Sequence, residues 1–134
     1  MPPSKGQYVK DHTKRWAATI APLDGFVFVT PEYNHSTSGV LKNAIDYLYA
    51  EWTNKAAAFI SYGSVGGTRA VEHLRLVMGE LQVADVRQQV ALSLFTDFEN
   101  FNDFKPADLQ VTFLQTMFDQ LVAWSTALAT LRTG

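Results

Sequence analysis

Cysteine is absent from this sequence of 134 residues. Without cysteine, neither a disulfide framework nor a thiolate metal site can form, which fits a reducing compartment. The three histidines, His12, His35 and His73, have no carboxylate partner at a spacing typical of metal ligands. We therefore expect a cytoplasmic protein without a metal site.

An excess of positive charge is missing as well. The chain has 11 Lys and Arg residues against 13 Asp and Glu residues, for a formal net charge of −2. Surfaces that bind nucleic acids or anionic membranes are normally basic, so neither is expected as the main partner. No apolar run is long enough to cross a bilayer, and residues 1–7 contain no apolar signal core. We expect a soluble protein.

What is present is enough apolar sequence for a core. Hydrophobic residues make up 47% of the chain and aromatic residues 13%, which suits one globular domain over residues 1–134. Helical and strand patterns alternate, which predicts an α/β fold with a parallel sheet and helices on both of its faces. The expected helices cover residues 8–21, 40–48, 70–81 and 114–128, and the expected strands cover 26–29, 56–62 and, more weakly, 86–92.

Two loops of unusual composition follow the first two expected strands. Residues 31–38 combine a proline, a carboxylate, a tyrosine, an asparagine and three hydroxyl residues, and residues 63–67 carry three glycines. In a parallel sheet both loops lie at the carboxyl-terminal edge, where ligands bind, so we expect them to be neighbours. With Ser36 or Ser38 capping the next helix, backbone donors and the helix N-terminus give a positive potential suited to an anion such as phosphate.

Each loop also has a purely structural interpretation. The first would be a capped turn in which Pro31 and Asn34 only set backbone angles. The second matches neither GxGxxG nor the P-loop, and its glycines by themselves favour close packing of a strand against a helix. On the functional interpretation, Tyr33 offers a flat apolar face to a ring, while Glu32 and Asn34 hold the loop or bond a ring edge.

A catalytic triad can be drawn from Ser36, His73 and Asp97. No nucleophile elbow surrounds the serine, so we discount this triad. Glu72 and Arg75, close to His73 in the sequence, indicate a solvated helix face. We therefore expect His73 to lie on a solvated face of its helix.

Residues 95–104 place four phenylalanines, each three residues apart, in a segment otherwise rich in turn-forming residues. A free loop would not expose so much aromatic surface, so this segment is expected to pack on its own core, on a second subunit or over a ligand. Tyr47, Tyr49 and Trp52 add a second aromatic group at and beyond the end of the 40–48 helix. We favour a subunit interface for both groups.

Two longer stretches together resemble a known family. "VTPEYNHSTSGVLKNAIDYL" (residues 29–48) and "SYGSVGGTRAVEHLR" (residues 61–75) look like the NAD(P)H-dependent FMN reductases, flavodoxin-like proteins that include quinone, chromate and azo-dye reductases. The resemblance covers nearly the whole chain. It implies a flavodoxin-like sheet of strand order 2-1-3-4-5, FMN as cofactor, NAD(P)H as reductant, a quinone or similar electron acceptor, and homodimers or homotetramers.

The resemblance also implies which residues contact the cofactor. No residue is assigned a catalytic role, because hydride transfer belongs to the flavin. We therefore predict no essential acid or base among the side chains, and no effect of His73→Ala on flavin retention or turnover. One small departure from the family pattern is Ser38, where proline is usual before the glycine. The residues expected along the isoalloxazine are Pro31, Glu32, Tyr33, Asn34 and Ser36, with Tyr62, Gly63, Gly66 and Gly67 on its other flank.

A larger departure lies before the first expected helix. Members of this family begin with a strand, a GS-x-R-x-x-S loop that wraps the FMN phosphate, a helix and a second strand, and this sequence contains none of them. We therefore expect an N-terminally truncated fold with the 26–29 strand at an edge, inactive as it stands and holding FMN weakly. Three interpretations compete: an N-terminal part missing from this sequence, which we favour; a non-catalytic interaction or oligomerisation domain; and a second polypeptide that supplies the missing strands.

Overall fold

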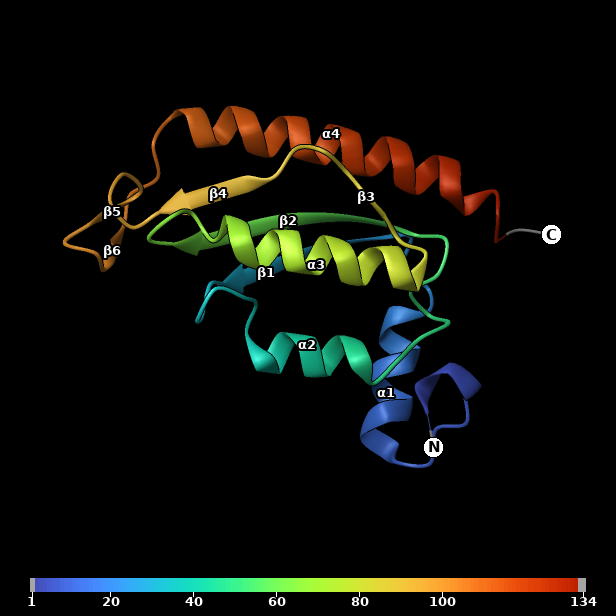
Figure 1. Cartoon of the computed structure of the whole chain (residues 1–134). Coiled ribbons are helices and arrows are strands. Elements are labelled where there is room, and N and C mark those ends of the chain that lie inside the picture. The colour runs from blue at the N-terminus through green and yellow to red at the C-terminus, as the bar shows by residue number, and fades with distance from the viewer. Residues whose placement is uncertain (1, 133–134) are drawn as a thin grey trace.

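The computed structural model describes residues 2–132 and is an α/β sandwich (Figure 1). A short 3-10 helix, η1, opens the described chain at Pro3–Lys5. The longer helices are α1 (Asp11–Ile20), α2 (Gly39–Asp46), α3 (Thr68–Leu81) and α4 (Leu109–Ala129). The strands are β1 (Gly25–Pro31), β2 (Ala56–Gly63), β3 (Ala84–Asp85), β4 (Val90–Ser93), β5 (Phe98–Glu99) and β6 (Asp103–Phe104).

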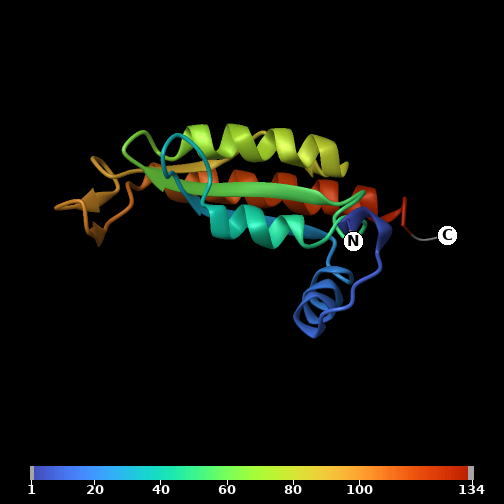
Figure 2. The ribbon, with the colours of Figure 1, turned by 60° about the horizontal axis from the view of Figure 1, so that its bottom comes forward.

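The main sheet is parallel, as predicted. β2 lies at its centre and pairs with β1 on one side and with β3 and β4 on the other. Helix α4 covers one face, while α2 and α3 cover the other, and α1 projects from the body of the molecule (Figures 1 and 2). This arrangement brings the carboxyl-terminal ends of β1 and β2 to one edge of the sheet, where the two polar loops begin.

β1 is an edge strand, also as predicted. Within residues 2–132 it pairs with β2 alone, so its other edge has no strand partner there. A cavity of about 400 Å³ runs along this strand, lined largely by apolar side chains from α1, α2 and β1 itself. An unpaired apolar edge is a surface on which another chain can pair.

The third strand is not the single run 86–92 that the sequence predicts, because side chains take up its backbone groups. Arg75 donates to the carbonyl oxygens of Val86 at 2.9 Å and of Arg87 at 3.3 Å. The amide of Gln88 donates to Oε1 of Gln120 at 2.8 Å. Residues 86–89 therefore lie outside any strand: β3 ends before them, β4 begins after them, and the two strands pair with different parts of β2.

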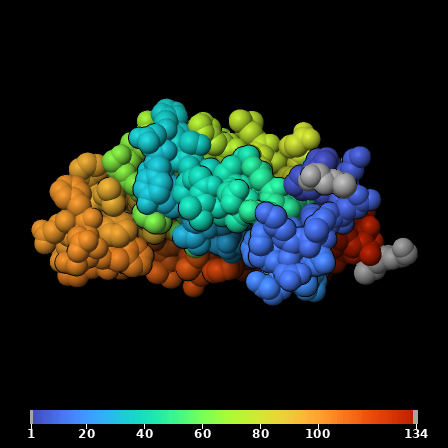
Figure 3. Space-filling model, turned by 90° about the horizontal axis from the view of Figure 1, so that it is seen from below, coloured from blue at the N-terminus to red at the C-terminus, as the bar shows by residue number. Residues whose placement is uncertain are grey.

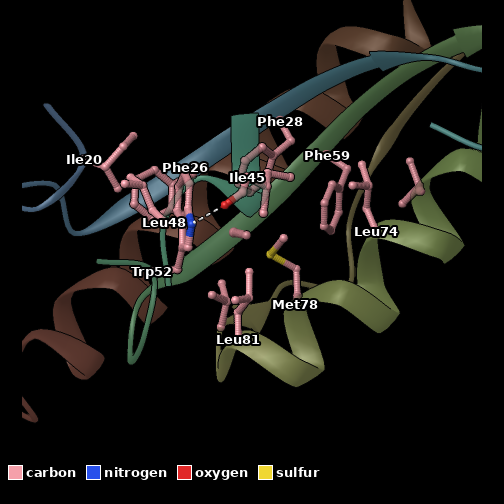
Figure 4. Close-up of a cluster of buried hydrophobic side chains, with 13 residues drawn as sticks. Ile20, Phe26, Phe28, Ile45, Leu48, Trp52, Phe59, Leu74, Met78 and Leu81 are labelled. Carbon is pink, nitrogen blue, oxygen red and sulfur yellow. Dashed lines mark hydrogen bonds between the residues drawn. The ribbon is translucent and has the colours of Figure 1, made fainter. Parts of the chain in front are cut away.

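The prediction that Trp52 lies at a subunit interface is wrong. Its side chain is buried, and its ring centroid lies 5.0 Å from that of Phe26 and 5.9 Å from that of Phe28 (Figure 4). The indole nitrogen donates to the carbonyl oxygen of Ile45 at 3.1 Å, which gives this buried polar atom its partner. The chain after α2 turns back towards β1, so the indole fills the core between them.

The phenylalanine-rich segment, residues 95–104, consists of a turn that carries Phe95 and the β5–β6 hairpin that follows it. Phe98 packs against the core beneath α4, whereas Phe95, Phe101 and Phe104 are each more than half exposed. The rings of Phe95 and Phe101 meet edge to face with centroids 5.4 Å apart. Of the four phenylalanines, one therefore packs on the protein's own core. That the other three lie at a subunit interface stays a prediction.

Asp97 anchors the base of this hairpin. The side chain is 1% exposed and accepts hydrogen bonds from the backbone amides of Ser93 and Ala107, each at 2.9 Å, and from the side chains of Thr96 and Gln110. Burial by itself would raise the pKa of Asp97, but these hydrogen bonds outweigh it and hold the pKa below its ordinary value.

We expect Asp97→Asn to lower the free energy of unfolding at pH 7 by about 2 kcal/mol, because the ionised carboxylate accepts bonds that an amide cannot fully replace. Because the pKa of Asp97 is lower in the folded state, the ionised carboxylate stabilises the fold at pH values above the ordinary Asp pKa of about 4. This stabilisation is lost as the pH falls through the folded-state pKa. Urea unfolding should therefore separate the two proteins at pH 7, and the difference should shrink as the pH falls through the folded-state pKa of Asp97. Exposed Asp119 supplies the control, and an Asp119→Asn variant with the same pH-dependent loss would contradict the assignment.

Candidate functional site

The two polar loops are neighbours at the carboxyl-terminal edge of the sheet, as predicted. The amide of Glu32 donates to the carbonyl oxygen of Tyr62 at 3.1 Å. A methyl group placed on Gly63 would lie 3.4 Å from Cβ of Glu32. The loop after β1 and the turn after β2 therefore form one continuous surface.

The first loop closes in a tight turn around residues 33–36. Tyr33 and Ser36 exchange two backbone hydrogen bonds of 3.0 and 3.1 Å, and Asn34 and His35 between them have positive φ angles of 49° and 71°. Two successive positive φ angles are typical of a type I′ turn, which needs Asn or Gly more often than His. The turn presents the Tyr33 side chain, which is 61% exposed.

The glycine turn is shaped by close packing of backbone on backbone. Gly66 and Gly67 have φ angles of 75° and 71°, and the hydroxyl of Ser61 donates to the carbonyl oxygen of Gly66 at 2.6 Å. A Cβ on Gly67 would lie 2.7 Å from Cβ of Ser61 and 2.8 Å from the amide nitrogen of Tyr62. The structural interpretation therefore holds for Gly67, where only glycine fits, and the positive φ angle of Gly66 agrees with it.

Glu32 faces into the protein. Its side chain is 5% exposed; Oε1 lies 2.5 Å from Nε of Arg69, and Oε2 accepts from the backbone amide of Arg69 at 3.2 Å. Because Arg69 is the second residue of α3, the carboxylate caps this helix from a different loop, in place of the side chain that Gly67 lacks at the N-cap. The carboxylate thus partly neutralises the positive end of α3.

Two histidines connect the same loop to α3. Nδ1 of His73 lies 2.8 Å from the hydroxyl of Ser36, and Nδ1 of His35 lies 3.0 Å from Nη1 of Arg69. The two imidazole rings are 6.0 Å apart. His73 is exposed, as predicted, but its contact with Ser36 was missed, because residues 37 positions apart carry no local pattern that links them. Asp97 has its own partners elsewhere, which supports rejection of the triad.

The side chains at this edge of the sheet are better suited to bind a flat aromatic ring than a phosphate. Tyr33 and Tyr62 are 61% and 36% exposed and offer ring faces at the same edge. The cation at this edge, Arg69, is engaged with Glu32 and His35. The first turn of α2 is already capped by the Ser38 hydroxyl, which accepts from the amide of Leu41 at 3.2 Å, so Ser38 and not Ser36 is the cap.

Residues 2–132 contain neither a candidate metal cluster nor a candidate membrane-spanning helix. In this part of the chain, no three His, Asp or Glu side chains are grouped so that they could hold a metal ion. Among the helices described, none combines the length and the apolar character needed to cross a membrane.

Comparison with solved structures defines the class of fold. FerB, a flavoenzyme NAD(P)H:(acceptor) oxidoreductase from Paracoccus denitrificans, superposes with a TM-score of 0.72 over 89% of this chain and 70% of its own, at 24% sequence identity. At that identity the match establishes the fold, which is flavodoxin-like.

Comparison of sequences defines the family. The profile described as NADPH-dependent FMN reductase matches residues 2–97, and the chain therefore belongs to that family. The NAD(P)H-dependent FMN reductase ntnL of Nectria sp is 46% identical over 108 residues, which cover 77% of this chain and 53% of that protein. A quinone reductase of Pseudomonas putida is 36% identical over 124 residues, which cover 83% of this chain and 63% of that protein. The chain thus spans about half to two thirds of the length of these relatives.

Proposed function

We propose that this chain forms part of an NAD(P)H-dependent reductase that holds FMN against the carboxyl-terminal edge of the sheet. When bound, FMN would take a hydride from NAD(P)H and pass the electrons to a quinone or a similar small molecule. The observation that carries the proposal is the meeting of the 31–38 loop with the glycine turn, in a chain of the FMN reductase family. The alternative of a non-catalytic interaction domain has no support among relatives named as reductases.

The proposed cofactor-binding residues are of two kinds: some would contact the isoalloxazine ring, and others would shape the loops around it. Tyr33 and Tyr62 would present their ring faces to the isoalloxazine, since both are accessible at the same edge. Glu32 would act indirectly, since its carboxylate is turned towards Arg69. The remaining proposed cofactor-binding residues would set the shape and the close approach of the backbone: Pro31, Asn34, Ser36, Gly63, Gly66 and Gly67.

We propose a quinone as the electron acceptor because quinone reductases of Pseudomonas putida and Burkholderia sp are among the relatives. A homodimer or homotetramer is proposed because three phenylalanine rings of residues 95–104 are exposed. The lack of cysteine supports a cytoplasmic location.

Titration with FMN, followed by flavin fluorescence, tests the proposed ring site. The 134-residue polypeptide is expected to bind FMN weakly, because a phosphate needs several free donors or a cation and Arg69 is already paired. Tyr33→Ala should weaken this binding by about 5- to 10-fold, the usual value of one aromatic contact.

Leu76→Ala is the matched control, because Leu76 is 76% exposed and lies on α3 about two turns beyond Arg69. It should leave the titration unchanged. Tight stoichiometric quenching by the 134-residue polypeptide would show that its own groups satisfy the phosphate. Equal affinities for the Tyr33→Ala variant and the parent chain would remove Tyr33 from the ring site.

A further inference from the structure

The turn at residues 33–36 holds two successive residues in the left-handed region of the backbone. Asn34 has φ 49° and His35 has φ 71°, and non-glycine residues adopt such angles uncommonly, although Asn and His do so more often than most. Such a conformation persists only where surrounding contacts impose it. The contacts that do so here are made by α3.

Two side chains from the first two turns of α3 bind the 31–38 loop, one on each side of Tyr33 in the sequence. Before Tyr33, Arg69 binds the carboxylate of Glu32; after it, His73 meets the hydroxyl of Ser36 at 2.8 Å. Arg69 and His73 are one helical turn apart, so they lie on the same face of α3.

Arg69 also contacts His35 directly. Its Nη1 lies 3.0 Å from Nδ1 of His35, and since a guanidinium can only donate, Nδ1 must accept. This hydrogen bond requires the His35 tautomer that carries its proton on Nε2. One arginine thus binds both the start of the loop and one of its two residues with a positive φ angle.

Tyr33 is placed by its backbone. Its amide and carbonyl groups pair with those of Ser36, while its side chain is largely exposed. Whatever fixes Glu32, His35 and Ser36 therefore also fixes the direction in which the Tyr33 ring leaves the chain.

We propose that Arg69 and His73 are positioning residues that lock the 33–36 turn and thereby set the Tyr33 ring for the flavin. The inference rests on the proposed function, because the ring is useful only if a flavin lies against it. It replaces the sequence-based expectation that His73→Ala has no effect.

Amide hydrogen exchange, measured by NMR on the flavin-free 134-residue chain, tests the lock separately from any cofactor. Arg69→Ala and His73→Ala should each raise exchange at the amides of Tyr33 and Ser36 by about 10-fold, with no comparable rise in β2, because local opening becomes easier. His73→Asn should restore protection, since its amide can occupy the place of Nδ1 and bond Ser36. Leu76→Ala, lower on the same helix, should leave these amides unchanged.

Unchanged exchange at Tyr33 and Ser36 in both alanine variants would overturn the inference. An equal rise throughout β2 would also overturn it, because the two residues would then support general stability. The FMN titration of the same variants gives the second readout, with an expected loss of about 5-fold, similar to that of Tyr33→Ala. Faster exchange without a loss of FMN affinity would refute the link to the flavin. If Tyr33→Ala also left FMN affinity unchanged, the failure would lie with the proposed ring site, and the lock itself would stand.

Discussion

Gly67→Ala is expected to lower the free energy of unfolding by about 3 kcal/mol, through backbone strain and overpacking together. The residue has a φ angle of 71°, and a Cβ there would lie 2.7 Å from Cβ of Ser61 and 2.8 Å from the backbone nitrogen of Tyr62. Neither neighbour is the free end of a flexible side chain, so β2 or the start of α3 must shift. Urea unfolding monitored by tryptophan fluorescence measures the loss.

Gly79→Ala is the control for this variant, because Gly79 lies in the same helix and an added Cβ there has no neighbour within 4 Å. Alanine is favoured over glycine inside a helix, so this variant should gain about 0.5–1 kcal/mol. A loss below 1 kcal/mol for Gly67→Ala would mean that the turn relaxes easily, and that the close approach between α3 and β2 does not require glycine.

The 134-residue chain is expected to sediment as a dimer or a larger assembly at micromolar concentration. Phe95, Phe101 and Phe104 are 67%, 63% and 58% exposed in residues 95–104, which form one end of the molecule (Figure 3). An aromatic cluster of this size is unusual on the surface of a monomer. Phe95→Ser combined with Phe101→Ser should weaken association by at least about 10-fold, because buried aromatic rings dominate interface energies.

The unpaired edge of β1 offers a different route to association, and a second variant separates the two. Val29 is 57% exposed on that strand, and a lysine there should hinder pairing along the edge. Loss of association in Val29→Lys but not in the double phenylalanine variant would move the interface to β1. Leu76→Ser is the control and should leave the association unchanged. A parent chain that sediments as a monomer would contradict the proposed assembly.

The family and the α/β class follow from short-range patterns. The strand at residues 56–62 and the helix at 70–81 are recognisable because apolar spacing depends on the period of each element alone. The position of the two loops follows as well, since the carboxyl ends of parallel strands meet at one edge. Glu32 and the glycines could therefore be placed at a common site before any coordinates were known.

Only the tertiary structure decided what each of those residues does there. Glu32 turns towards Arg69, and Ser36 meets His73, in both cases across 37 positions of sequence. Trp52 was expected at an interface and lies in the core, because burial depends on the path of the chain after α2. Long-range contacts of this kind arise when separate elements pack, and local periodicity carries no information about which side chains then become neighbours. The sequence by itself determined the first two strands, the longer helices and the edge of the sheet at which the two loops meet. The packing of α3 against the 33–36 turn determined how the first of these loops is held.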